Sequence, residues 1–318
     1  MLKQDLFAPG PGCRAPADWV LRGTSILLVL LSVSTASAGG RLGGLREDVR
    51  PSPSPSPPSP PAPSEPPPRE VHHHHHHYNY DSDDEDTAGL YAVGGLFVFM
   101  GVTSPFWAPH SALGDDFAVD GSFPQRPYQC GSGYMISPTW PGCCELDFDR
   151  LRFTPRRWSG RLRADYGDDF GDLSRVGGHL LLSTTSRWGL DTEAYRFEEN
   201  LPASASDQLW IGDCNLIFRF AQNERMQWRT GLGLNWMDDP AGTDFGFNFT
   251  YGVDYFPANP WILSATLDWG TLGSAELFHF RTTAGVVLLG IETYTGYEYY
   301  DIDRTQINSL IAGVRIWF

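Results

Sequence analysis

The sequence has little positive charge for its length. Among 318 residues, 23 are lysine or arginine and 38 are aspartate or glutamate, which gives a formal net charge of −15 and a pI near 4.9. Nucleic-acid binding needs a basic patch that neutralises phosphates, and none is visible. We therefore predict no nucleic-acid partner. The acidity itself indicates only a soluble or exported protein.

Long hydrophobic runs are also missing. The run ILLVLLSV, residues 26–33, is well short of the roughly 20 residues that a transmembrane helix requires. Basic residues precede it, and Ala36-Ser37-Ala38 supplies the small residues that signal peptidase reads. We interpret residues 1–38 as a cleaved export signal, with an uncleaved inner-membrane anchor as the alternative.

Cysteines are few, and known cofactor motifs are absent. Cys13 lies in the export signal, whereas Cys130, Cys143 and Cys144 lie together. An exported protein could form a disulfide from Cys130 to either of the other two. Adjacent cysteines lack the C-x-x-C spacing of a zinc site. The sequence has no G-x-S-x-G elbow, phosphate loop, haem motif or nucleotide fingerprint, so we predict no cofactor.

Residues 39–87 are of low complexity, and we interpret them as a disordered linker. Residues 51–68 are almost pure proline and serine, which cannot bury apolar surface and favour extended polyproline II. A histidine run and the acidic stretch DSDDED follow. The imidazoles could bind nickel, copper or zinc; an inserted tag or a solvated stretch are the alternatives. The candidate metal ligands are His72, His73, His74, His75, His76 and His77.

Residues 88–156 form a second segment before the regular pattern begins. AGLYAVGGLFVFMGV, residues 88–102, carries no charge. It is too short and glycine-rich to predict a membrane span, so an interfacial or packed helix competes with that interpretation. Residues 103–156 are rich in proline, glycine and aromatics without a clean period. We interpret 88–156 as an apolar segment followed by an irregular periplasmic region, and no function can be assigned to it.

From about residue 157 to the end, the sequence alternates with a period of two. Period-two segments of about ten residues between short turns have the length of tilted strands that cross a bilayer. The segments lie near residues 159–168, 174–184, 187–198, 208–221, 226–237, 243–256, 261–270, 275–287, 290–300 and 305–318. An even count suits a closed barrel. We predict an all-β, antiparallel up-and-down transmembrane β-barrel of about 10 strands (8–12) over residues 157–318.

The polar row of these strands contains arginines and carboxylates but no lysine. Solvent-exposed faces usually carry lysine and glutamate, whereas arginine paired with carboxylate suits a narrow lumen. Eight acids against six arginines on the inward rows indicate a mutually paired polar core. The predicted lumen network consists of Arg163, Asp165, Asp191, Glu193, Asp213, Arg219, Arg229, Asp254, Asp268, Arg281, Glu292, Glu298 and Arg315.

The apolar row is large and aromatic, and it would overfill a ten-stranded barrel from inside. We therefore expect it to face lipid. Aromatic residues fall at both strand ends, as two membrane interfaces select. One predicted girdle contains Trp188, Phe220, Trp228, Tyr255, Phe256, Trp261 and Phe318, and the other contains Trp210, Trp236, Trp269 and Tyr299. The alternative is a soluble lipocalin-like β-barrel, with its apolar row inward around a small apolar ligand.

Over roughly the last 160 residues, the sequence resembles the bacterial outer-membrane β-barrel proteins. The most specific element is the final LIAGVRIWF, in which Phe318 follows Ile316 and Val314 at every second position. This pattern looks like the signal that the barrel assembly machinery reads. The resemblance implies insertion into outer-membrane lipid by that machinery, with the C-terminus in the periplasm. We then expect the N-terminal extension in the periplasm as well, where it could reach a periplasmic partner.

For function, the sequence favours a structural outer-membrane barrel, with at most a narrow pore for small solutes. The near balance of charge argues against a strongly ion-selective pore. A barrel enzyme, a protease or a lipid hydrolase, is the alternative, because Asp268 and His279 on neighbouring strands could form an Asp-His pair. No nucleophile motif accompanies this pair, so we predict that the protein is not an enzyme.

Overall fold

The computed structural model describes residues 40–52, 85–115, 122–129, 133–136, 156–202 and 205–318. For residues 85–98, only the backbone is described. The predicted export signal, the histidine run and Cys130, Cys143 and Cys144 lie outside the described residues.

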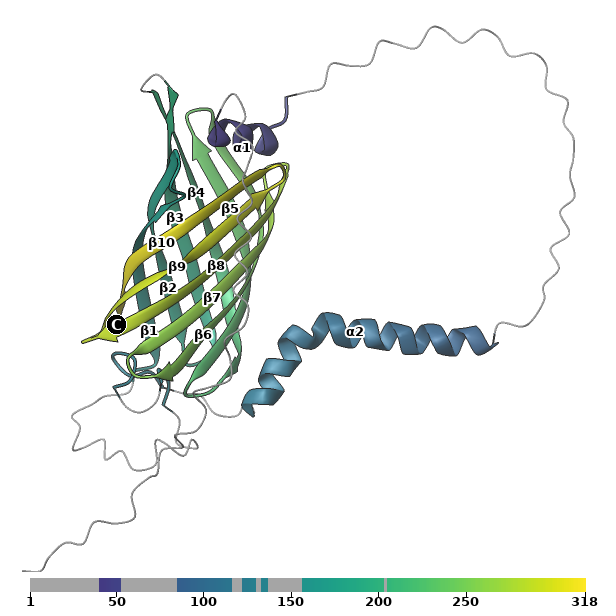
Figure 1. Cartoon of the computed structure of the whole chain (residues 1–318). Coiled ribbons are helices and arrows are strands. Elements are labelled where there is room, and N and C mark those ends of the chain that lie inside the picture. The colour runs from purple at the N-terminus through teal and green to yellow at the C-terminus, as the bar shows by residue number, and fades with distance from the viewer. Residues whose placement is uncertain (1–39, 53–84, 116–121, 130–132, 137–155, 203–204) are drawn as a thin grey trace, which may run out of the picture. The chain divides into compact units, whose positions relative to one another are not determined.

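Ten antiparallel strands close into one up-and-down barrel (Figure 1). Each strand pairs with its sequence neighbours, and β1 closes the ring against β10. The strands are β1 Trp158–Asp168, β2 Leu173–Thr184, β3 Trp188–Leu201, β4 Ala205–Gln222, β5 Met226–Asp239, β6 Gly242–Ala258, β7 Trp261–Leu272, β8 Ala275–Leu288, β9 Ile291–Ile302 and β10 Thr305–Trp317. The predicted fold class and strand number are confirmed.

Period-two alternation sets which side chains point inward. In β10, Arg315 is fully buried, whereas its neighbours Val314 and Ile316 are 44% and 45% exposed. Because side chains in a strand alternate between the two faces, one closed ring separates a polar interior from an apolar exterior. The seam between β1 and β10 runs in register from Arg161 opposite Trp317 to Asp168 opposite Leu310.

Two irregularities interrupt this pattern at one end of the barrel. The register shifts between Phe218 and Ala221 in β4, and between Tyr255 and Ala258 in β6. Phe256 is 0% exposed and packs with Trp317 inside the mouth of the barrel, so its predicted place in a lipid-facing girdle is wrong. Phe256 lies two residues after the inward-facing Asp254, and residues two apart in a strand share a face. Phe220 is 7% exposed because it is covered on the outer wall by Phe106 of α2 (Glu85–Leu113).

A short helix, α1 (Arg41–Val49), precedes the barrel in the chain. The sequence assigned these residues to a disordered linker, and the structure corrects that interpretation. Two internal glycines make the segment a poor helix former on its own. The carboxylate of Glu199 in β3 accepts bonds from the backbone N–H groups of Arg41 and Leu42 at 2.7 and 2.9 Å, and so satisfies donors that a helix N-terminus leaves free.

A longer helix, α2 (Glu85–Leu113), contains Pro105 and Pro109. Its C-terminal half contacts the outer wall of the barrel. The ring of Phe106 lies 5.6 Å from Phe220, and the hydroxyl of Tyr251 donates to the carbonyl of Pro105 at 2.6 Å. Within the described residues, helices that are both long and apolar enough to cross a membrane are not found.

Candidate functional site

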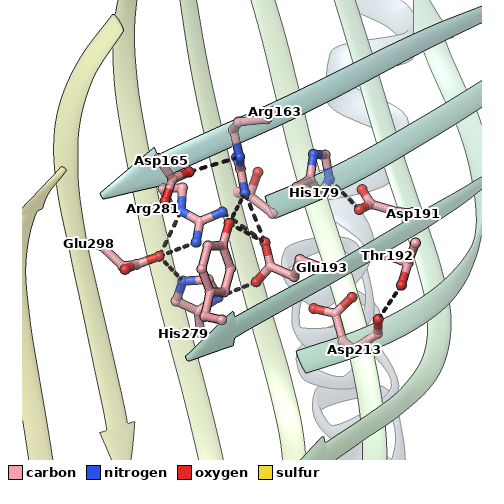
Figure 2. A network of polar contacts seen from close by, with 12 residues as sticks. Arg163, Asp165, His179, Asp191, Thr192, Glu193, Asp213, His279, Arg281 and Glu298 are labelled. Carbon is pink, nitrogen blue, oxygen red and sulfur yellow. Dashed lines mark hydrogen bonds and ion pairs between the residues drawn. The ribbon is translucent and has the colours of Figure 1, made fainter. Parts of the chain in front are cut away.

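The barrel interior holds a dense group of charged side chains, which we call the His279 network. It comprises Arg163 and Asp165 of β1, Arg175 of β2, Glu193 of β3, Asp268 of β7, His279 and Arg281 of β8, and Glu298 of β9. Six strands contribute, and all of these side chains are at most 8% exposed. Figure 2 shows most of them pointing toward one another across the lumen.

Each arginine of the His279 network bridges two or more strands. Arg281 donates to Glu298 at 2.7 Å from Nε and to Glu193 at 2.8 Å from Nη1. Arg163 donates to the same Glu193 oxygen at 2.9 Å. Arg175 pairs with Asp165 at 2.7 Å and also with Glu298. These bonds link β1, β2, β3, β8 and β9 through the lumen, as Figure 2 shows in part, so the network fastens opposite walls of the barrel together.

His279 lies at the centre of the network. Its Nδ1 is 2.8 Å from Asp268 Oδ2 and its Nε2 is 3.0 Å from Glu298 Oε1. The ring stacks on Tyr300 with centroids 4.0 Å apart. An imidazole with a carboxylate on both nitrogens acts as a double donor, so its role here is that of a cation between two acids.

A second group of charged side chains, the Asp254 network, lies nearer the end of the barrel at which β10 ends. Asp254 accepts from Arg161 at 2.8 Å, from Arg229 at 2.6 Å and from the hydroxyl of Ser264 at 2.6 Å. Arg315 pairs with Glu292 at 2.7 Å in the same half of the lumen. Buried charges are tolerated only when paired and hydrogen-bonded, and both networks meet that condition for most of their members.

An apolar layer covers the lumen at the mouth where α1 lies, which we call the α1 mouth. Leu42, Leu45 and Val49 of α1 are 0–2% exposed. They pack into a cluster of inward-facing residues near the strand ends, including Tyr195, Phe197, Ile211, Met237, Leu272, Leu277, Tyr300 and Ile302. Helix α1 therefore closes this mouth with apolar contacts.

The opposite end, the C-terminal mouth, is covered by a loop segment. Phe123, Tyr134 and Met135 pack with Phe256 and Trp317 of the barrel. The Tyr134 and Trp317 rings are 4.6 Å apart, and Trp317 Nε1 donates to Glu292 at 2.9 Å. Both mouths are thus closed by residues that precede the barrel in the chain.

The structure places all thirteen predicted lumen residues on the inner face, each at most 8% exposed. It adds contributors that the prediction did not include. Arg175 was missed although it lies four residues before His179 in β2, and both side chains are buried on the inner face. The even spacing from an inward-facing residue was the available signal. Tyr195, which accepts from Arg163 at 2.6 Å, was missed because tyrosine occurs on both faces of these strands.

The outer face of the barrel is apolar around its circumference. Large exposed side chains come from nearly every strand and include Leu162, Val176, Leu190, Leu216, Leu232, Leu234, Phe245, Phe247, Leu263, Trp269, Ile291, Leu310, Val314 and Ile316. Exposed apolar surface on this scale is rare on soluble monomers. A polar interior inside an apolar wall is the reverse of a lipocalin-like barrel, and it is the pattern of a strand barrel in lipid.

The fold is a transmembrane β-barrel. No family model matches the sequence, and no curated protein matches it. Among solved structures, it is similar to Ail of Yersinia pestis at 12% identity, over 50% of this chain and 99% of that one, with a TM-score of 0.29. It is similar to the Neisserial surface protein NspA at 13% identity, over 51% of this chain and 96% of that one, with a TM-score of 0.28. It is similar to the KdgM porin at 12% identity, over 50% of this chain and 99% of that one, with a TM-score of 0.23.

These neighbours are bacterial outer-membrane β-barrels, in agreement with the resemblance seen in the sequence. Their identities and TM-scores are too low to carry an argument about activity. The assignment of the barrel to a membrane therefore depends on its closed ring of strands and its apolar outer wall.

The candidate catalytic residues Asp268 and His279 are brought together, but the barrel encloses them. They are 3% and 2% exposed, below the apolar layer of the α1 mouth. A neighbouring cavity of about 10 Å³, lined also by Asp213 and Asn235, has room for about one water molecule. The geometry offers a water site beside the pair and no space there for a substrate.

A metal ion also fits this cluster poorly. Glu193, Asp268 and His279 bring one potential ligand atom each within 4.8 Å of one another. Metal binding needs an imidazole nitrogen free of its proton, whereas both nitrogens of His279 face carboxylates. Glu193 already accepts from Arg163 and Arg281. The cluster is better described as an ion-pair network.

Proposed function

We propose that the protein is a structural outer-membrane barrel whose lumen is closed. The observation that carries this proposal is the filling of the interior, with two paired-charge networks between apolar layers at both mouths. A solute-conducting barrel needs a continuous water path, and side chains occupy the described lumen. The networks join strands on opposite walls, so they also stiffen the barrel against deformation in the bilayer.

The final strand supports insertion by the barrel assembly machinery. Val314, Ile316 and Phe318 all lie on the outer face, 44%, 45% and 36% exposed, where a partner protein could read them during assembly. Outer-membrane lipid is the expected surrounding of the wall. The Pro-Ser spacer and its histidine run give the N-terminal extension reach toward a further partner, because polyproline extends about 3.1 Å per residue.

The two ends of the N-terminal extension contact different mouths. Helix α1 binds the β9–β10 turn through Arg304 and Asp48 at 2.7 Å, whereas Asp115 binds Arg187 at the C-terminal mouth at 2.6 Å. If Phe318 lies in the periplasm, α1 lies on the outer side, and the chain between α1 and Asp115 must then pass from one side of the membrane to the other. The extension as a whole is predicted to lie in the periplasm; at the C-terminal mouth, Asp115 in its later part contacts the barrel.

Orientation can be tested with single cysteines in two exposed turns. In intact cells, a membrane-impermeant maleimide should label an Ala241→Cys variant, because the β5–β6 turn lies at the α1 mouth. Leu289→Cys, in the β8–β9 turn at the C-terminal mouth, should react only after the outer membrane is permeabilised. The unsubstituted protein gives the background from native cysteines. The reverse labelling pattern would contradict the orientation.

Conductance tests the closed lumen. Folded full-length protein inserted into a planar bilayer should give no steady ionic current above that of the bare bilayer, because the His279 and Asp254 networks block the path. Insertion is checked in parallel by the slower or faster gel mobility that unboiled, folded barrel shows against boiled protein. Stable ohmic steps from a verified sample would replace this proposal with the narrow-pore alternative.

A further inference from the structure

The rim of the α1 mouth is acidic, and its acids are bound by α1. Asp169 pairs with Arg41, Asp207 with Arg46, and Asp244 with Arg50. Asp239 receives both Arg46 at 2.6 Å and Arg50 at 2.8 Å. Within the described residues, the arginines that pair with these four acids all belong to residues 41–50. Without this segment the rim is a ring of uncompensated carboxylates.

Below the rim, the mouth forms an apolar floor that α1 covers. Leu42, Leu45 and Val49 fall on one side of the helix, since residues three and four apart share a face. All three are almost fully buried against the barrel. The arginines lie at the edge of this contact, where their side chains remain 23–29% exposed. An apolar stripe flanked by cations matches an apolar floor inside an acidic rim.

Individual side chains fix the position of the helix. Arg46 donates to Asp239, to both oxygens of Asp207 and to the carbonyl of Gln208. The hydrogen bonds to Asp207 and Asp239 raise the pKa of Arg46 above its ordinary value, the bond to Asp207 most of all. Gly40 has φ +78°, and a Cβ there would lie 2.6 Å from Glu199 Oε2. The left-handed φ favours glycine here, and the missing Cβ leaves room for the capping carboxylate.

The attachment is that of a bound peptide rather than of a wall element. Helix α1 pairs with no strand. Among the described residues, one backbone–backbone bond joins it to the barrel, from Ser274 N to the carbonyl of Val49 at 3.1 Å, and its other bonds to the barrel involve side chains such as those of Glu199 and Ser274. A nine-residue helix is below the roughly 12–15 residues at which isolated helices become marginally stable. The segment therefore depends on the mouth for its helical form, as segments that fold on binding do.

We propose that the α1 mouth is a peptide-binding site, and that residues 40–50 of this chain are its reversibly docked ligand, folding into α1 on binding. The recognised pattern is three apolar residues, Leu42, Leu45 and Val49, with arginines at 46 and 50 that reach the acidic rim. The proposal does not depend on the closed lumen, because the His279 network lies below the mouth and remains in place when α1 leaves.

The test uses folded full-length protein with a protease site inserted in the Pro-Ser spacer, residues 51–68. After cleavage at low salt, the N-terminal fragment should stay with the barrel through gel filtration. An excess of a synthetic peptide of residues 39–52 should then displace it. Raising the salt to about 1 M, where screening acts over about 3 Å instead of 10 Å, should speed release.

Specificity is read from the competing peptides, so that the barrel itself is not altered. A peptide with Arg46→Ala and Arg50→Ala should compete about tenfold less well or worse, since it loses four partly exposed ion pairs. Glu47→Gln is the matched control, because Glu47 is exposed on the same helix, and it should compete like the parent peptide. Immediate loss of the fragment on cleavage would overturn the proposal. So would a fragment that excess parent peptide cannot displace, or equal competition by all three peptides.

Discussion

Replacing Glu298 by alanine is expected to lower the free energy of unfolding of the barrel by about 3–5 kcal/mol. Glu298 is 0% exposed and accepts from Arg281 and His279 while pairing with Arg175. Removing it leaves three donors facing one another in a closed interior, and a buried charge without a partner is costly. Urea unfolding of vesicle-inserted protein, followed by tryptophan fluorescence and by gel mobility, measures the change.

The control for this substitution lies on the same barrel but in water. Glu198 in β3 pairs with Arg196 at 3.5 Å, and its side chain is 42% exposed. Glu198→Ala should change the free energy of unfolding by no more than about 0.5–1 kcal/mol, as exposed ion pairs do. Equal losses from Glu198→Ala and Glu298→Ala would mean that water reaches the His279 network, and the closed lumen would then be wrong.

The barrel could be predicted from the sequence because a strand buries every second residue. In β10 alone, the order Val314, Arg315, Ile316 already separates the two faces, and the exposures follow it. The same rule places Asp268 and His279 in the lumen on adjacent strands, where the structure joins them at 2.8 Å. Parity determines the face of a residue without any knowledge of its partners.

Partners across the lumen could not be predicted in this way. Arg161 binds Asp254 over 93 residues, from β1 to β6, and that pairing depends on barrel diameter, strand stagger and the reach of each side chain. The burial of Phe220 likewise depends on tertiary packing, since its ring lies 5.6 Å from that of Phe106 in α2. The period-two pattern alone carries no information on the pairs across the lumen or on the contact of Phe220 with α2.

Helix α1 was missed for a different physical reason. The segment RLGGLREDVR has two glycines and a polar composition, so its intrinsic helix propensity is low. Its helical form comes from the mouth: Glu199 accepts its first backbone donors, and the floor takes Leu42 and Leu45. A segment whose structure is stabilised by a distant partner gives a weak local signal, and the composition of its flanking spacer suggests disorder instead.

Replacing Leu232 by arginine should destabilise the lipid-inserted barrel by about 2–4 kcal/mol, the cost of arginine near the middle of the hydrocarbon layer. Leu232 is 58% exposed, lies midway along β5, and is flanked on β4 by Leu216, which is 59% exposed. In water the same substitution at an exposed site costs little. Urea unfolding in vesicles therefore separates a membrane wall from a soluble one.

The matched substitution is Leu289→Arg in the β8–β9 turn, where Leu289 is 88% exposed beyond the strand ends. It should cost about 0–1 kcal/mol, because arginine there can keep its charge in the headgroup region or in water. A large loss of unfolding free energy for Leu232→Arg with a small loss for Leu289→Arg is the dependence on depth that a bilayer imposes. Two small costs would mean that the apolar belt is not in lipid, and both the membrane assignment and the orientation argued from it would fail.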